Sequence, residues 1–142
     1  MYKHILIPTD GSESAVRAGK HAIELAKSTG AKVAIVTVSA PFRVVSFGIP
    51  HTRAAYTKRA KELARVALRD LVEIAKEANV TYNAGHVEHR HVYQAILKEA
   101  ATRRCDLIVM GSHGESGVAA LVLGSVVTKV LTHATVPVLI VR

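Results

Sequence analysis

The 142-residue chain lacks several features that define whole classes of protein. Its single cysteine, Cys105, cannot form an internal disulfide, and no cysteines or histidines have the spacing of a zinc finger. We therefore expect a reducing, cytoplasmic location. No apolar run approaches the ~18 residues needed to span a bilayer, and no signal-peptide pattern opens the chain. These absences predict a soluble protein with no membrane partner.

Aromatic and acidic residues are also scarce. Two Phe, four Tyr and no Trp leave few rings on which bases could stack, which argues against single-stranded nucleic acid as a ligand. Nineteen Lys and Arg against eleven Asp and Glu give a formal net charge of +8, which favours an anionic partner such as a nucleotide or nucleic acid. Neither the Walker A motif nor the Gly-x-Gly-x2-Gly motif occurs, so the commoner nucleotide-binding signatures are excluded.

Hydrophobic residues make up 49% of the chain, too many for a disordered protein. The length, and the absence of repeats, linkers or low-complexity segments, predict a single domain over 1–142. Short apolar runs predict strands over 4–8, 33–38, 106–110 and 136–141, and the more polar segment 80–87 is a further strand candidate. Helical periodicity predicts helices from a cap at Asp10 or Ser12 to Gly30, and over 52–79, 92–101 and 125–132.

This alternation predicts an α/β fold, a three-layer doubly wound parallel sheet of five strands with right-handed crossovers. The strand over 80–87 is polar enough for a sheet edge, and Pro137 places the last strand at the other edge. The segment 39–50 follows a strand and is interpreted as a loop that covers a ligand.

The most informative motif lies between the fourth strand and the last helix. Met110-Gly111-Ser112-His113-Gly114 follows the strand, and Gly124-Ser125-Val126 begins nine residues later. Gly111 and Gly114 can adopt φ > 0 and turn backbone N–H groups, including that of His113, toward phosphate oxygens. The start of the last helix attracts the same charge. The alternatives are that the glycines only form turns and that Ser125 is only an N-cap.

The spacing Gly-x2-Gly-x9-Gly-Ser resembles the signature of the ATP-binding branch of the universal stress protein family. The likeness extends along the chain, from the 8–12 loop to the closing segment 136–142. It implies a Rossmann-like adenine-nucleotide-binding fold with strand order 3-2-1-4-5, whose ligand lies where strands one and four meet. It also implies a role in the stress response or signalling, with ATP accompanied by Mg or Mn as ligand and ADP or AMP as alternatives.

The resemblance also assigns roles to single residues. The position of Val38 offers its backbone to the adenine edge in relatives. Asp10 repels bare phosphate, so its carboxylate is expected to accept from a ribose hydroxyl or hold a divalent metal, or else to cap the first helix. The predicted nucleotide-binding residues are Pro8, Thr9, Asp10, Val38, Met110, Gly111, Ser112, His113, Gly114, Gly124, Ser125 and Val126.

Two positions depart from the family pattern. Glu115 stands where many relatives have a basic residue, and Val127 stands where Ser or Thr is frequent. Both weaken the phosphate end of the site, which makes ADP or AMP competitors for ATP. His86, His89 and His91 are close in sequence, but without a carboxylate at a known spacing they indicate solvated side chains rather than a metal centre.

Two further functions and one assembly were considered. A slow ATP hydrolase or autophosphorylating enzyme needs a general base near the γ-phosphate, and the sequence offers none, so no catalytic residue is predicted. A nucleic-acid-binding protein could use the basic residues of 52–79, but the acids Glu62, Asp70 and Glu73 among them indicate a solvated helix face. The apolar last strand predicts a homodimer through that strand, as does the resemblance.

Overall fold

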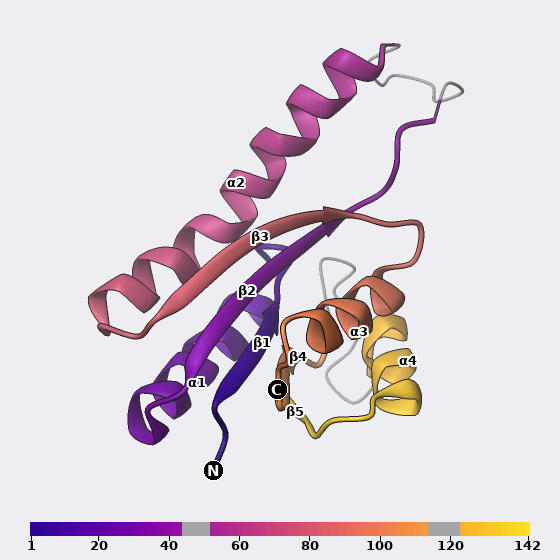
Figure 1. The fold of residues 1–142 in the computed structure, drawn as a ribbon. Helices are drawn as coiled ribbons and strands as arrows, with labels where there is room; N and C mark the ends of the chain where they lie inside the picture. Colours follow the sequence, from indigo (N-terminus) through magenta and orange to yellow (C-terminus); the bar gives the residue numbers. More distant parts are fainter. Residues whose placement is uncertain (44–51, 114–122) are drawn as a thin grey trace.

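The computed structural model describes residues 1–43, 52–113 and 123–142. At its centre, parallel strands lie in the order β3-β2-β1-β4-β5 (Figure 1). The strands are β1 (His4–Pro8), β2 (Lys32–Ser39), β3 (Tyr82–Glu88), β4 (Leu107–Gly111) and β5 (Val138–Val141). The predicted five-stranded α/β fold and its order are confirmed, and the winding reverses between β1 and β4.

Helices cover both faces of this sheet and complete three layers. α1 (Glu13–Thr29) and α2 (Arg53–Glu77) pack on one face, whereas α3 (Val92–Thr102) and α4 (Ser125–His133) pack on the other (Figure 1). In the described parts of the chain, none of the helices combines the length and the apolar character that a membrane crossing requires.

The central strands are apolar on both faces because helices cover both. In β1, Ile5 and Ile7 pack into the core cluster formed with α1 and α2. Leu6, between them, packs into the cluster formed with α3 and α4. All three side chains are fully buried, so the uninterrupted apolar run of this strand reflects two cores rather than one.

The start of α1 is capped by Ser12, whose hydroxyl accepts a hydrogen bond from the Ala15 N–H at 3.3 Å. Of the two predicted caps, Ser12 is therefore the one used. Gly30 ends the helix with a φ of 76°, a left-handed conformation that glycine adopts at little cost.

The last strand begins two residues later than predicted, at Val138. The Pro137 carbonyl still accepts from the Ile108 N–H at 3.0 Å, but Pro137 has no N–H with which to continue the ladder. Both predicted edge strands are confirmed, since β3 and β5 form the two edges of the sheet.

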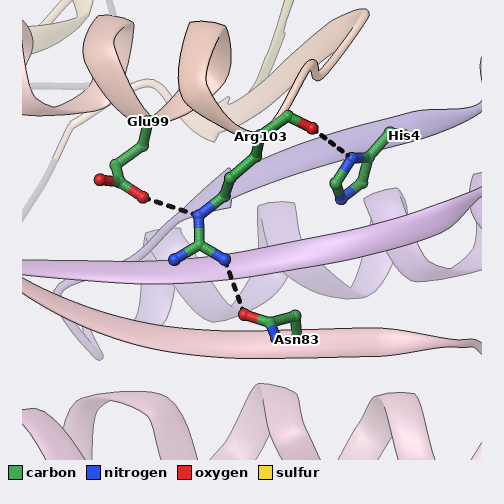
Figure 2. Close-up of polar contacts among 4 residues, drawn as sticks. All are labelled: His4, Asn83, Glu99 and Arg103. Carbon is green, nitrogen blue, oxygen red and sulfur yellow. Dashed lines mark hydrogen bonds and ion pairs between the residues drawn. The ribbon is translucent and has the colours of Figure 1, made fainter.

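A polar network around Arg103 fixes the amino ends of the strands (Figure 2). The guanidinium donates to the Glu99 carboxylate and to the Asn83 side-chain oxygen, both at 2.6 Å, which ties α3 to β3. The Arg103 carbonyl accepts from His4 Nδ1 at 2.9 Å. Burial lowers the pKa of His4, which favours the neutral ring. Nearby Cys105 is buried, and burial raises its pKa to about 11, so its thiol serves packing rather than chemistry.

Candidate functional site

A pocket of about 290 Å³ lies at the carboxyl ends of β1 and β4, where the winding of the sheet reverses. Parallel α/β sheets bind their ligands at this place. Ten of the twelve residues predicted from the sequence line the pocket: Pro8, Thr9, Asp10, Val38, Met110, Gly111, His113, Gly124, Ser125 and Val126. The sheet thus brings together segments that are a hundred residues apart in the chain.

The loop after β1 is held by a backbone hydrogen bond to β2 and by its own side chains. The Thr9 N–H donates to the Val36 carbonyl at 2.8 Å, and Thr9 Oγ1 accepts from the Gly11 N–H at 3.0 Å. Asp10 Oδ1 accepts from the Ser12 N–H at 2.9 Å, just before α1 begins. These bonds hold the Asp10 carboxylate at the pocket in an exposed position, where it can meet a polar ligand group.

Gly111 does not adopt the positive φ that the motif allows, whereas its contact with phosphate stays a prediction. It is the last residue of β4, and its φ is outside the left-handed region, so it does not form the expected turn. A Cβ at this position would lie 2.5 Å from the Ser14 hydroxyl oxygen and 2.9 Å from the Ser14 carbonyl oxygen. Glycine is therefore required here because α1 crosses β4 too closely for any side chain.

The start of α4 faces the pocket, and its N-cap is Gly124. Among the described residues, no side chain accepts a capping hydrogen bond there. Ser125 is the first residue of the helix, so the alternative that it is the N-cap is wrong. The backbone N–H groups of a helix start carry partial positive charge. With Ser125 and Val126 in the lining, this end of the pocket is suited to an anion.

Two predicted site residues are not placed in the pocket lining. Ser112 is 2% exposed, and its backbone donates to the Val141 carbonyl at 3.1 Å and accepts from the Gly124 N–H at 2.8 Å. It therefore joins β4 to β5 and to α4. Gly114, like Glu115, lies outside the described residues. His113 lines the pocket, and its Nδ1 lies 3.0 Å from the Ser112 hydroxyl.

The lining contains apolar residues that sequence reasoning missed, namely Ala15, Val36, Val92 and Ile96, and it includes Val127, which the sequence had placed at the phosphate end. Two spacings could have revealed part of this wall. Val36 lies two residues before Val38 on the same face of a strand, and Val92 and Ile96 are one turn apart on a helix. The pocket therefore joins an apolar wall, suited to a flat ring, with a helix start suited to an anion.

The three histidines near β3 take part in local hydrogen bonds. His86 Nε2 lies 2.7 Å from the Ser39 hydroxyl, and His89 Nδ1 accepts from the His91 N–H at 2.9 Å. Over residues 1–43, 52–113 and 123–142, no group of three or more His, Cys, Asp or Glu could hold a metal ion.

The sequence profile of the universal stress protein family matches residues 1–142. The chain belongs to this family. Among its relatives, the universal stress protein MJ0531 of Methanocaldococcus jannaschii is 34% identical over 142 residues, which cover 100% of this chain and 83% of that protein.

Solved structures show the same fold. The structure of the hypothetical protein MJ0577 aligns with a TM-score of 0.79 and 28% identity, covering 99% of this chain and 96% of that one. A universal stress protein in complex with cAMP aligns with a TM-score of 0.73 and 28% identity, covering 99% and 97%. Structures at 21% and 17% identity, from Archaeoglobus fulgidus with dAMP and Arabidopsis thaliana with AMP, share the fold. Some structural neighbours therefore bind adenine nucleotides.

Proposed function

We propose that this universal stress protein binds an adenine nucleotide, ATP first, in the pocket at the carboxyl ends of β1 and β4. The observation that carries the proposal is the start of α4, which lines the pocket and has no capping side chain among the described residues. A helix start of this kind stabilises a phosphate group. The apolar wall next to it suits a base, and the neighbour in complex with cAMP supports adenine.

In the proposed orientation, the phosphates lie at the start of α4 and the adenine lies beside Val38. Asp10 then accepts from a ribose hydroxyl or shares a Mg or Mn ion with the phosphates. Asp10 alone offers too few ligands for such an ion, so phosphate oxygens and water would complete its shell. Val127 is buried at the pocket and has no hydroxyl for the phosphates, which keeps ADP and AMP as competing ligands.

The test is to identify and then titrate the ligand. Protein purified from its source is denatured, and the released small molecules are analysed by mass spectrometry. The ligand-free protein is then titrated calorimetrically with ATP, ADP, AMP and GTP, with and without Mg²⁺. We expect adenine nucleotides to bind and GTP to bind more weakly. No heat from any adenine nucleotide at millimolar concentration would contradict the proposal.

The alternative is a slow ATP hydrolase or autophosphorylating enzyme. We predict turnover below about one per second, the lower end of ordinary enzymes, because the sequence has no Walker lysine and none of the described residues at the site is assigned as a general base. The check is a single-turnover assay with radiolabelled ATP and excess protein, repeated with Glu115→Arg to supply a cation. Faster turnover in the parent would make the protein an enzyme. Otherwise holding the nucleotide is the function, as a nucleotide-dependent module of the stress response.

We further propose a homodimer through β5. This strand is at the sheet edge, and its residues are half-buried and apolar. The Pro137 carbonyl accepts from Ile108 in β4, and the Val141 carbonyl accepts from Ser112 directly after β4. Ile140, one residue before Val141, therefore directs its N–H and C=O toward the edge. An unpaired apolar edge favours pairing with another strand, and a two-fold axis would pair β5 with itself.

Removing one edge N–H should break this dimer. We expect Ile140→Pro to sediment as a monomer at concentrations where the parent and Ile140→Ala sediment as dimers, because proline removes a donor whereas alanine only shortens the side chain. Sedimentation velocity at micromolar concentration measures the masses, and circular dichroism confirms folding. A monomeric parent, or a dimeric Ile140→Pro, would refute the β5 interface.

A further inference from the structure

Helix α2 has an exposed face that the nucleotide site does not use. Its buried residues, Ala64, Leu71 and Ala75, pack toward the sheet. The other side of the helix carries two large apolar side chains, Leu63 and Val66, which are 57% and 44% exposed. In Figure 1, α2 lies in an outer layer, and its first turns project beyond the strands.

Leu63 and Val66 belong to a regular row of exposed residues. The row, called here the α2 seam, consists of Arg59, Leu63, Val66, Asp70, Glu73 and Glu77. Its steps alternate between four and three residues, the spacing that places side chains along one line between two paired helices. Isolated exposed apolar residues are common on protein surfaces, and only the neighbouring pair Leu63 and Val66 is apolar in this row. What distinguishes the row is the arrangement of charged residues on either side of that pair.

The charges along the α2 seam are sorted by position. The amino-terminal end carries the cation Arg59, the middle is apolar, and the carboxyl-terminal end carries Asp70, Glu73 and Glu77. Within the described residues, Arg59 forms no ion pair. Asp70 has only a 3.5 Å contact with Arg69, and both side chains are 53% exposed, which makes the contact weak.

We propose that the α2 seam pairs with the α2 seam of a second copy, with the two helices antiparallel. A two-fold axis between Leu63 and Val66 places Leu63 against Val66 of the second copy, and Val66 against Leu63 of the second copy. The same axis, at about 1.5 Å rise per residue, leaves Arg59 and Asp70 each about 8 Å from the centre on opposite sides. Arg59 then faces the partner's Asp70, and Asp70 faces the partner's Arg59.

A second copy fits this surface because the charges of two α2 seams match only when the two helices are antiparallel. A parallel arrangement would place Arg59 against Arg59 and acid against acid, whereas the antiparallel one matches opposite charges at both ends. With one apolar pair flanking the axis on each side, the contact is small and the association weak. This interface is separate from β5 and independent of nucleotide binding.

The test measures self-association by sedimentation equilibrium from micromolar to millimolar concentration, in the parent and in an Ile140→Pro background that removes the proposed β5 contact. We expect Leu63→Glu, Arg59→Asp and Asp70→Arg each to raise the dissociation constant of the α2 contact by at least about tenfold, since every change occurs twice in a two-fold interface. The double reversal Arg59→Asp/Asp70→Arg should restore most of the parent affinity, because opposite charges again face each other.

Matched controls lie off the seam. Lys58→Asp makes the same charge change one residue away on another side of α2, and Leu131→Glu changes a 42% exposed leucine on α4. Both should associate like the parent. The proposal is overturned if the parent shows no α2-dependent association at millimolar concentration. It is equally overturned if Leu63→Glu associates like the parent, or if the double reversal stays as weak as the single variants.

Discussion

Replacing Asp10 by alanine is expected to weaken nucleotide binding more than any other single change in the loop after β1. Losing a hydrogen bond to a charged group costs about 1.5 to 3 kcal/mol, which is about tenfold to more than a hundredfold in the dissociation constant. The Asp10 carboxylate is at the pocket, held by the Ser12 N–H, so its loss removes a pre-positioned acceptor. Isothermal titration calorimetry with ATP and Mg²⁺ provides the measurement.

Asp10→Asn separates this role from the local fold. Asparagine keeps an oxygen that can accept from the Ser12 N–H, so the start of α1 should be unchanged. If the carboxylate binds a ribose hydroxyl, the asparagine variant should retain part of the affinity, with or without metal. If it holds the cation, the loss should match that of alanine and vanish when Mg²⁺ is omitted. Parent affinity in both variants would remove Asp10 from the site.

The fold was predictable because each strand carries its own signal. Buried runs such as Ile5-Leu6-Ile7 are apolar at every position, and only a sheet covered on both faces buries all of them. The order of the strands was not readable from these runs. It came from the family resemblance, because which strands become neighbours depends on how the helices cross between them.

The pocket was partly predictable for a related reason. Residues directly after strands or before helices, such as Asp10 and Ser125, are placed by the fold itself, since the carboxyl ends of parallel strands share one edge. Ser112 was assigned by its neighbours in the motif, yet its backbone pairs with β5 and α4. Val92 and Ile96 were missed because an apolar residue on a helix has the same pattern whether it faces a core or a pocket.

Gly111 shows most clearly what a motif cannot reveal. Its spacing to Gly114 and Gly124 suggested a backbone turned toward phosphate. The structure requires glycine at this position because Ser14, almost a hundred residues earlier in the chain, leaves no room for a Cβ. A contact of that kind depends on how tightly α1 packs on β4, which no local pattern encodes. The same glycine can serve both purposes, and only substitution separates them.

Gly111→Ala is therefore expected to act first on stability. The added Cβ would lie 2.9 Å from the Ser14 carbonyl oxygen, a backbone atom that cannot turn away. Overpacked core substitutions lower the free energy of unfolding by up to about 3 kcal/mol, and we expect this one to reach or exceed that loss. Gly124→Ala is the contrast, because its Cβ would meet the His113 Cα at 3.3 Å, which a small shift relieves. That variant should stay folded and lose nucleotide affinity at the start of α4.

Urea unfolding measures the stability of both variants, and calorimetry measures their nucleotide affinity, so together they separate packing from binding. Ser14→Ala tests whether the clash with Ser14 causes the loss of stability. The Ser14 hydroxyl is buried and has no hydrogen-bond partner among the described residues, so its removal alone should stabilise the protein. Combined with Gly111→Ala, it should recover part of the lost stability, because it removes the 2.5 Å clash with the hydroxyl but leaves the carbonyl in place. A Gly111→Ala variant as stable as the parent would show that α1 can yield, and would return Gly111 to the phosphate-binding role that its motif suggests.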